Sequence, residues 1–184
     1  MMINNLESKR VILREMEEND WIDVHTYASL EKVCQYQPWG PNSEQESKEF
    51  VLQVLVDAKK KTRSRFVFAI IIKGNEEMIG AGEINIRDYT NRTGEIGYIV
   101  NPQYWGKGFA TEVAKLLLAY GFTELKLHRI FATCDPRNIG SLKVLEKVGM
   151  SEEGRMREVL LLKDGWRDSL LYSILEREWE SEYQ

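Results

Sequence analysis

Between Glu95 and Thr111, an apolar segment typical of a strand passes through a short loop directly into a segment typical of a helix. The loop contains Gly106 and Gly108, which leave no side chain between the backbone and an approaching ligand. A helix that begins after such a loop exposes several backbone N–H groups, and these groups bind phosphate well. Lys107 adds a positive charge and Thr111 a hydroxyl. The segment therefore predicts a phosphate or pyrophosphate site.

Two common phosphate motifs do not fit this segment. The dinucleotide fingerprint needs a third glycine and an early β-α-β unit, whereas this chain has Thr111 there and three predicted strands before the helix. The Walker motif needs Gly-Lys-Ser/Thr after a four-residue gap, and the loop lacks it. Taken alone, the two glycines also fit an ordinary turn before a helix.

The hydrophobic patterning around this segment predicts an α+β fold in the order β-α-α-β-β-β-α-β-α-β-β. A capping box of Ser43 and Glu46 marks the start of the second helix. No repeat or long linker interrupts the chain, so a single domain over residues 1–184 is expected. The predicted strands are 11–13, 65–72, 78–86, 94–100, 128–134 and two around the turn 163–165, and the predicted helices are 21–32, 43–60, 108–125 and 138–148.

Composition narrows the function classes. Lys and Arg together number 25 and Asp and Glu 29, for a net charge of -4, which argues against a nucleic-acid binder. Cys34, Cys134 and two histidines form no metal-ligand spacing or disulfide framework, so no metal is expected. The longest apolar runs are far shorter than the roughly 20 residues of a membrane span. The N-terminus lacks a signal-peptide pattern, and a cytoplasmic location is expected.

Two segments carry a resemblance to a known family. Trp105-Gly106-Lys107-Gly108-Phe109-Ala110-Thr111-Glu112 resembles the pyrophosphate-binding motif of GNAT acetyltransferases, Gln/Arg-x-x-Gly-x-Gly/Ala. Gly108 and Ala110 match its last two fixed positions, and Trp105 stands where Gln or Arg is usual. The segment from Asn138 to Met150 resembles the second motif, an Asn followed by a Glu-Lys-x-Gly-Phe-like helix end. The resemblance covers essentially the whole chain. Within the family, the chain is most similar to the RimJ/RimL-like branch, which is named for ribosomal-protein N-terminal acetyltransferases.

The resemblance implies a GNAT fold, with a mixed, mostly antiparallel twisted sheet of about six or seven strands flanked by helices. It also implies acetyl-CoA as cosubstrate, with the pyrophosphate on the glycine loop and the pantetheine arm beside the strand that carries Ile99 and Val100. The implied cofactor-binding residues are Ile99, Val100, Trp105, Gly106, Lys107, Gly108, Phe109, Ala110, Thr111, Asn138 and Ser141.

Acetyl transfer to an amine needs a base, a polarised carbonyl and a proton for the leaving thiolate. An α-amino group has a pKa of about 7.7–8.0, so the base removes only one proton. Glu95 is the first candidate, because it shares the side-chain parity of Ile99 on one strand. Glu83 and Glu158 are the alternatives. A backbone N–H near Val100 is expected to hold the oxyanion.

The proton donor is less direct to assign. Many members of the family place a Tyr in the helix after Asn138, but the corresponding residue here is Leu145. Ser141 is the replacement candidate, with an ordinary first-turn hydroxyl as the competing interpretation. Tyr98 has the opposite parity from Glu95 and is expected in the core.

Three functions stay open on the sequence. The first is an N-acetyltransferase acting on a primary amine by direct attack, such as the N-terminal amine of a ribosomal protein. The second is an acetyltransferase for a polyamine, an antibiotic or a toxic peptide. The third is an acetyl-CoA-binding sensor without efficient catalysis. The presence of Leu145 in place of the usual Tyr favours this function. Partners are therefore acetyl-CoA and an amine acceptor, with neither nucleic acid nor membrane, and relatives in the family often form homodimers.

Overall fold

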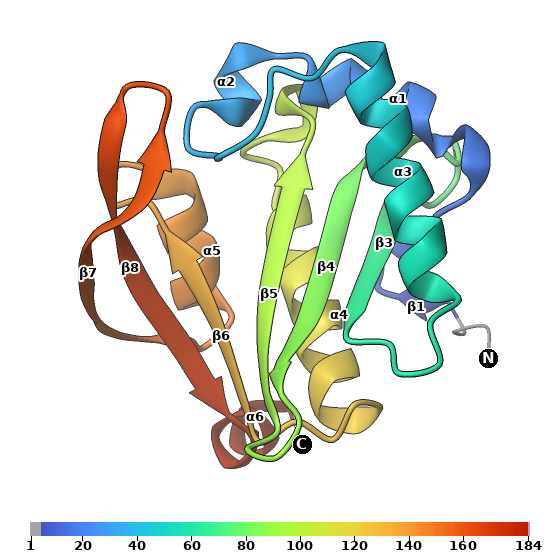
Figure 1. Cartoon of the computed structure of the whole chain (residues 1–184). Coiled ribbons are helices and arrows are strands. Elements are labelled where there is room, and N and C mark those ends of the chain that lie inside the picture. The colour runs from blue at the N-terminus through green and yellow to red at the C-terminus, as the bar shows by residue number, and fades with distance from the viewer. Residues whose placement is uncertain (1–4, 184) are drawn as a thin grey trace.

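The computed structural model describes residues 5–183 as an α+β fold with helices on both faces of one sheet (Figure 1). The strands are β1 (Leu6–Glu7), β2 (Val11–Glu15), β3 (Arg65–Ile72), β4 (Met78–Asp88), β5 (Thr93–Val100), β6 (Arg129–Cys134), β7 (Ser151–Leu162) and β8 (Gly165–Leu175). The helices are α1 (Trp21–Ala28), α2 (Glu31–Cys34), α3 (Glu44–Ala58), α4 (Phe109–Thr123), α5 (Ile139–Lys147) and α6 (Glu176–Tyr183), with 3-10 turns at Glu18–Asp20 and Pro102–Tyr104.

The strands form one sheet in the order β1-β2-β3-β4-β5-β6-β8-β7. Neighbouring strands are antiparallel except β5 and β6, which are parallel. The central strand β3 is apolar at nearly every position because both of its faces are covered. Phe68 and Ile70 belong to one core cluster, while Val67 and Ala69 belong to the other.

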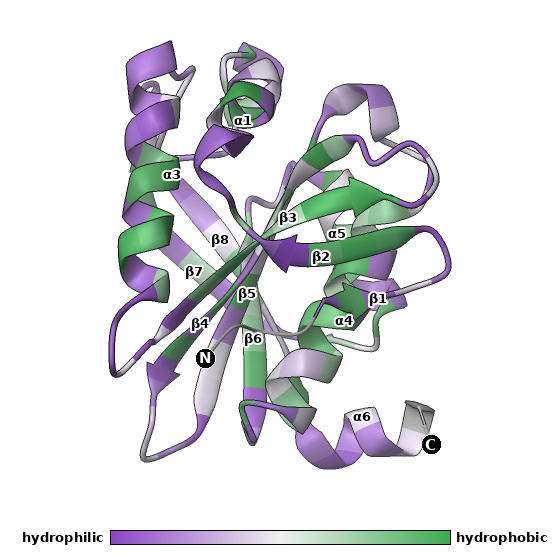
Figure 2. Cartoon of the chain, turned by 90° about the vertical axis from the view of Figure 1, so that its right-hand side faces the viewer, coloured by the Kyte–Doolittle hydropathy of each residue, from purple (hydrophilic) through white to green (hydrophobic). Residues whose placement is uncertain are grey.

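Each face of the sheet has its own helices. Helices α1, α2 and α3 cover the core that contains Val67, and α4 and α5 cover the core that contains Phe68. Figure 2 shows the apolar strands enclosed between these two groups of helices. In α4, Val113, Leu117 and Tyr120 are buried, and their i, i+4, i+7 spacing places them on one face of the helix.

The predicted α+β order is confirmed, with additions that local patterning did not indicate. The sheet has eight strands rather than six or seven, because the two-residue strand β1 pairs Leu6 with Leu13 on β2. The helix predicted over 21–32 ends at Ala28 and is followed by the separate short helix α2. The C-terminal segment, which lies outside the predicted strands and helices, forms α6, where the ring of Trp179 lies 5.4 Å from that of Phe122.

Two local predictions are matched in detail. The hydroxyl of Ser43 accepts from the Glu46 N–H, and the Glu46 carboxylate accepts from the Ser43 N–H, so the capping box begins α3. Gly149 follows α5 with a φ of +82°, which suits a helix end. No helix between residues 5 and 183 is long and apolar enough to cross a membrane.

Candidate active site

The two parallel strands at the centre of the sheet separate along their length. Their ladder joins Thr93 to Arg129, Gly94 to Ile130 and Glu95 to Phe131, and then ends. Beyond it, β5 stays paired with β4 on its other side and β6 stays paired with β8. The strands therefore form a V whose wide end lies toward α2 (Figure 1). An extended ligand entering the V meets backbone groups of both strands.

The edge of β5 that faces the V offers a backbone donor. The Asn101 N–H donates to the Ile79 carbonyl on the β4 side, at 2.7 Å. Because successive residues of a strand direct their backbone groups to opposite sides, the N–H and C=O of Val100 point into the V. The Val100 carbonyl accepts from the indole Nε1 of Trp105 at 2.6 Å. The Val100 N–H is thus the donor at the place where an oxyanion-holding group was predicted.

The glycine loop between β5 and α4 has the geometry of an anion site. Gly106 and Gly108 have φ values of +73° and +83°, a region that favours glycine. Gly108 is the N-cap of α4, and no side chain caps the helix. The first intrahelical bond runs from the Glu112 N–H to the Gly108 carbonyl, so the N–H groups of Phe109, Ala110 and Thr111 precede it. These donors and the space at the glycines fit the pyrophosphate of acetyl-CoA.

Arg10 joins this loop and was missed in the sequence. Its Nη2 lies 3.2 Å from the position of a Cβ on Gly108, and its guanidinium lies 4.5 Å from the centroid of the Phe109 ring. An ion pair of 2.5 Å with Glu112 in the first turn of α4 holds it there. Lys107, which was predicted, lies over the Tyr104 ring at 5.1 Å. No sequence pattern links Arg10 to the loop, because only the pairing of β2 into the sheet brings them together.

The start of α5 faces the V from the β6 side. The Oδ1 of Asn138 accepts from the Ser141 N–H at 3.2 Å, so Asn138 is the N-cap of α5. The Ser141 hydroxyl lies 3.1 Å from the hydroxyl of Tyr98 on β5. Tyr98 packs against the core as predicted, but its hydroxyl also reaches Ser141, and burial raises its pKa. Leu145 is 1% exposed, which places it in the core.

The three candidate bases occupy different positions. Glu95 stands at the last position where β5 pairs with β6, and it forms an ion pair of 2.5 Å with Arg87. Glu83 on β4 is in register with Gly97, and its Cγ lies 3.6 Å from the position of a Cβ there, so it lies against the separated part of β5.

The third candidate lies outside the β4–β5 pair, on the β7–β8 side of the sheet. Glu158 lies in the irregular part of β7, which β8 separates from β6, and its N–H donates to Asp168 at 2.7 Å. Ile99 also lies away from the α4 face, packed against the core beneath α1 and α3. The residues from 5 to 183 include no group of His, Cys, Asp and Glu that could hold a metal ion.

Comparison with known proteins identifies this architecture. The model of the acetyltransferase (GNAT) domain matches residues 10–151. The chain belongs to the GNAT acetyltransferase family. It is an N-acetyltransferase, and its cosubstrate is acetyl-CoA.

Three similar proteins show the range of acetyltransferases to which this chain is related. It is 38% identical over 175 residues to the uncharacterized N-acetyltransferase YnaD of Bacillus subtilis, covering 95% of this chain and 99% of that one. Spermidine N-acetyltransferase from Vibrio cholerae, solved with CoA and spermine, has a TM-score of 0.82 and 25% identity, covering 94% and 99% of the two chains. The ribosomal-protein-S5-alanine acetyltransferase from Vibrio fischeri has a TM-score of 0.80 and 25% identity, covering 96% and 99%. The relatives thus differ in the acceptors that their names give.

Proposed function

We propose that this acetyltransferase moves the acetyl group directly onto a primary amine, without an acyl-enzyme. The V between β5 and β6, with the Val100 N–H directed into it, is the observation that carries the proposal. A donor aimed at the thioester oxygen stabilises the charge that develops there. Cys134, at the end of β6, is buried, and burial raises the pKa of its thiol, which disfavours a thiolate nucleophile.

The proposal uses a carboxylate of the β4–β5 pair as the base. Glu95, the first candidate in the sequence, is close to Arg87 at the narrow end of the V. The position of Glu83 over Gly97 supports Glu83 as the better placed of the two. Its carboxylate pairs with Arg65 at 2.9 Å, and this ion pair holds the side chain in place on β4.

Ser141 is proposed to pass a proton to the leaving thiolate, with Tyr98 as its partner. Burial raises the pKa of Tyr98, so this phenol stays protonated and can donate to Ser141. The pair would thus replace the tyrosine that is absent at Leu145. A catalytic pair of this kind supports an enzyme over a sensor of acetyl-CoA.

The acceptor is proposed to be the N-terminal amine of a protein, as in the RimJ/RimL-like branch. The relative named a ribosomal-protein-S5-alanine acetyltransferase supports this choice. A polyamine is the second candidate, because another relative is named a spermidine N-acetyltransferase. We further propose a cytoplasmic enzyme, consistent with the free cysteines Cys34 and Cys134, and a homodimer through the edge strand β7, where Leu161 is 58% exposed.

Thiol release from acetyl-CoA, measured against a panel of amines, tests this function. The panel contains N-terminal peptides of ribosomal proteins, spermidine and aminoglycosides. Turnover with the peptides is the expected result, and turnover with spermidine alone would move the acceptor to the second candidate. Micromolar acetyl-CoA binding without turnover on any amine would contradict the enzyme and favour the sensor.

A further inference from the structure

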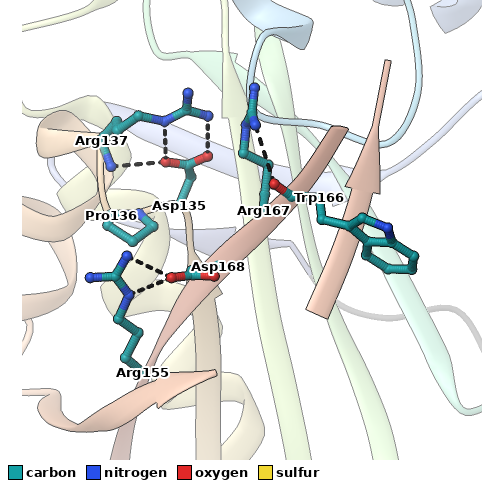
Figure 3. A pocket seen from close by; sticks show the side chains of 7 residues that line it. All are labelled: Asp135, Pro136, Arg137, Arg155, Trp166, Arg167 and Asp168. Atoms are coloured by element: carbon teal, nitrogen blue, oxygen red, sulfur yellow. Dashed lines mark hydrogen bonds and ion pairs between the residues drawn. The ribbon is translucent and has the colours of Figure 1, made fainter. Parts of the chain in front are cut away.

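A cavity of about 270 Å³ lies beside the wide end of the V, where β6 ends and the β7–β8 hairpin begins to bend over (Figure 3). Asp135 and Arg137 lie in the segment between β6 and the Asn138 cap of α5. Arg155 comes from β7, and Arg167 comes from β8. The cavity thus borders the segment that leads into α5, the helix that carries Ser141.

Two neighbouring features limit the space above the cavity. Tyr36, in the loop after α2, donates its hydroxyl to the Arg137 carbonyl at 3.3 Å. The indole of Trp166 is 57% exposed at the cavity edge. An acceptor that reaches the V from this side passes these two aromatic side chains.

The carboxylates in the cavity are already engaged. Asp135 accepts from the Arg137 N–H, Nε and Nη2 at 2.9, 2.9 and 2.6 Å. Asp168 accepts from the Glu158 N–H at 2.7 Å and from Arg155 Nε at 2.5 Å. The hydrogen bonds from Arg137 lower the pKa of Asp135, and the Glu158 N–H and Arg155 lower that of Asp168. Both aspartates are therefore ionised at neutral pH and have little capacity left for a ligand cation.

The remaining hydrogen-bonding capacity consists of donors. Arg167 donates from Nη1 to the Trp166 carbonyl and from Nη2 to Asp164. Its buried Nε has no acceptor within the part of the chain that the structure describes. No residue from 5 to 183 accepts from Nη1 of Arg137 or of Arg155. A buried donor without an acceptor costs free energy, so a ligand acceptor is favoured at the Nε of Arg167. The adjoining hollow adds one charge of each sign, Arg157 and Glu158.

We propose that this cavity binds a carboxylate carried by the amine acceptor, so that the substrate class is an amine with an acidic group. The inference rests on the proposed transfer to a primary amine. Arg155 and Arg167 meet the carboxylate, while the amine of the same molecule reaches the V. A polyamine carries ammonium groups, which donate hydrogen bonds and accept none, so it has no group for these donors. The carboxylate belongs either to a free amino acid or to an acidic side chain near a peptide N-terminus.

Turnover of matched amine pairs tests the proposal. Glycine, β-alanine and γ-aminobutyrate are each compared with the corresponding amide, and Ala-Asp and Ala-Glu peptides with Ala-Asn and Ala-Gln peptides. One charge-assisted hydrogen bond predicts a preference for the acid of about tenfold to a hundredfold in kcat/KM. Comparing the amino acids of increasing length with the peptides shows where the carboxylate comes from. Only a molecule whose amine and carboxylate are far enough apart can reach the V and the cavity at once.

Arg155→Gln is the main variant, since Arg155 is 61% exposed and its replacement leaves the core intact. It is expected to lower kcat/KM for the acid about tenfold and to leave the amide unchanged. Arg177→Gln, on the exposed side of α6, is the matched loss of one positive charge and should change neither. Equal rates for acid and amide in the wild-type protein, or an unchanged ratio in Arg155→Gln, would overturn the proposal.

A binding measurement separates this proposal from acetyl transfer itself. N-acetylglycine and N-acetylglycinamide are titrated by calorimetry in the presence of saturating CoA, which occupies the phosphate sites of the cofactor. Binding of the acid alone, weakened in Arg155→Gln, would support the carboxylate site even if no amine is acetylated. Acetylation of amines together with equal binding of acid and amide would refute the site and leave the transferase function standing.

Discussion

Tyr98 and Ser141 come from different elements, and their hydroxyls lie 3.1 Å apart. If they act as one proton donor, Tyr98→Phe and Ser141→Ala each lower kcat, by about 10²-fold, and the double variant loses little more. Single-turnover measurements of acetyl transfer test this double-mutant cycle, and acetyl-CoA affinity should stay within about threefold for Tyr98→Phe. Two losses that multiply would show that the hydroxyls act independently and would refute the shared proton donor.

Glu83 and Glu95 allow a direct comparison between two carboxylates on adjacent strands. Glu83→Gln is expected to lower kcat by about 10²-fold, because Glu83 lies against the open part of β5 and the amide cannot take the proton. Glu95→Gln should mainly release Arg87 and change kcat only a few-fold. The reverse order of effects would return the role of base to Glu95.

The junction of β5 and α4 depends on Gly108. Gly108→Glu is expected to abolish acetyl-CoA binding, because it puts a carboxylate beside the N–H groups of the first turn and strains a backbone with a φ of +83°. Gly74→Glu is the control for strain, since Gly74 has a φ of +103° in a turn with open space around it. Calorimetry with acetyl-CoA compares the two. Micromolar binding by a folded Gly108→Glu protein would refute the pyrophosphate site.

On the β6 side of the V, an ion pair between Glu153 and Arg129 joins β7 to β6. Glu153 on β7 bonds Arg129 on β6 and Ser173 on β8, and these hydrogen bonds lower the pKa of Glu153 from 4.5 to about 2. Because the pKa is lower in the folded state, the stabilisation is complete above about pH 4.5 and is lost as the pH falls toward 2.

The matching variant is Glu153→Gln. It should lower the free energy of unfolding at pH 7 by about 0.5–1 kcal/mol, since the side chain is partly exposed. Urea unfolding of both proteins from pH 7 to pH 3 measures the difference, which should shrink in acid. A difference that stays constant with pH would assign the loss to packing instead.

Elements with strong local patterns were predictable from the sequence, and those made by distant contacts were not. The range predicted for β3 equals the observed Arg65–Ile72, because an apolar run between polar turns is distinctive. Strand β1 consists of two residues and exists only because β2 pairs with it. Helix α6 consists mainly of charged and polar residues, so its packing through Trp179 could not be foreseen.

At the scale of the whole molecule, the same limit applies to the site. The glycine loop and the Asn138 cap were predictable because each lies in one continuous segment. Arg10, the Tyr98–Ser141 contact and the arginine cavity each combine segments that are far apart in the chain. Their assembly follows from the sheet order and from the point where β5 and β6 part.

The separation of β5 from β6 also leaves two strand edges facing each other inside one molecule. Beyond Glu95 and Phe131, neither edge is paired with the other. Open edges are templates for pairing with other chains, and proteins usually cover them. Cosubstrate bound in the V, as proposed, would cover them, so the loaded enzyme should resist aggregation and survive longer at raised temperature than the empty one. The concentration of acetyl-CoA would then determine how long the protein persists before it aggregates, as well as its rate of turnover.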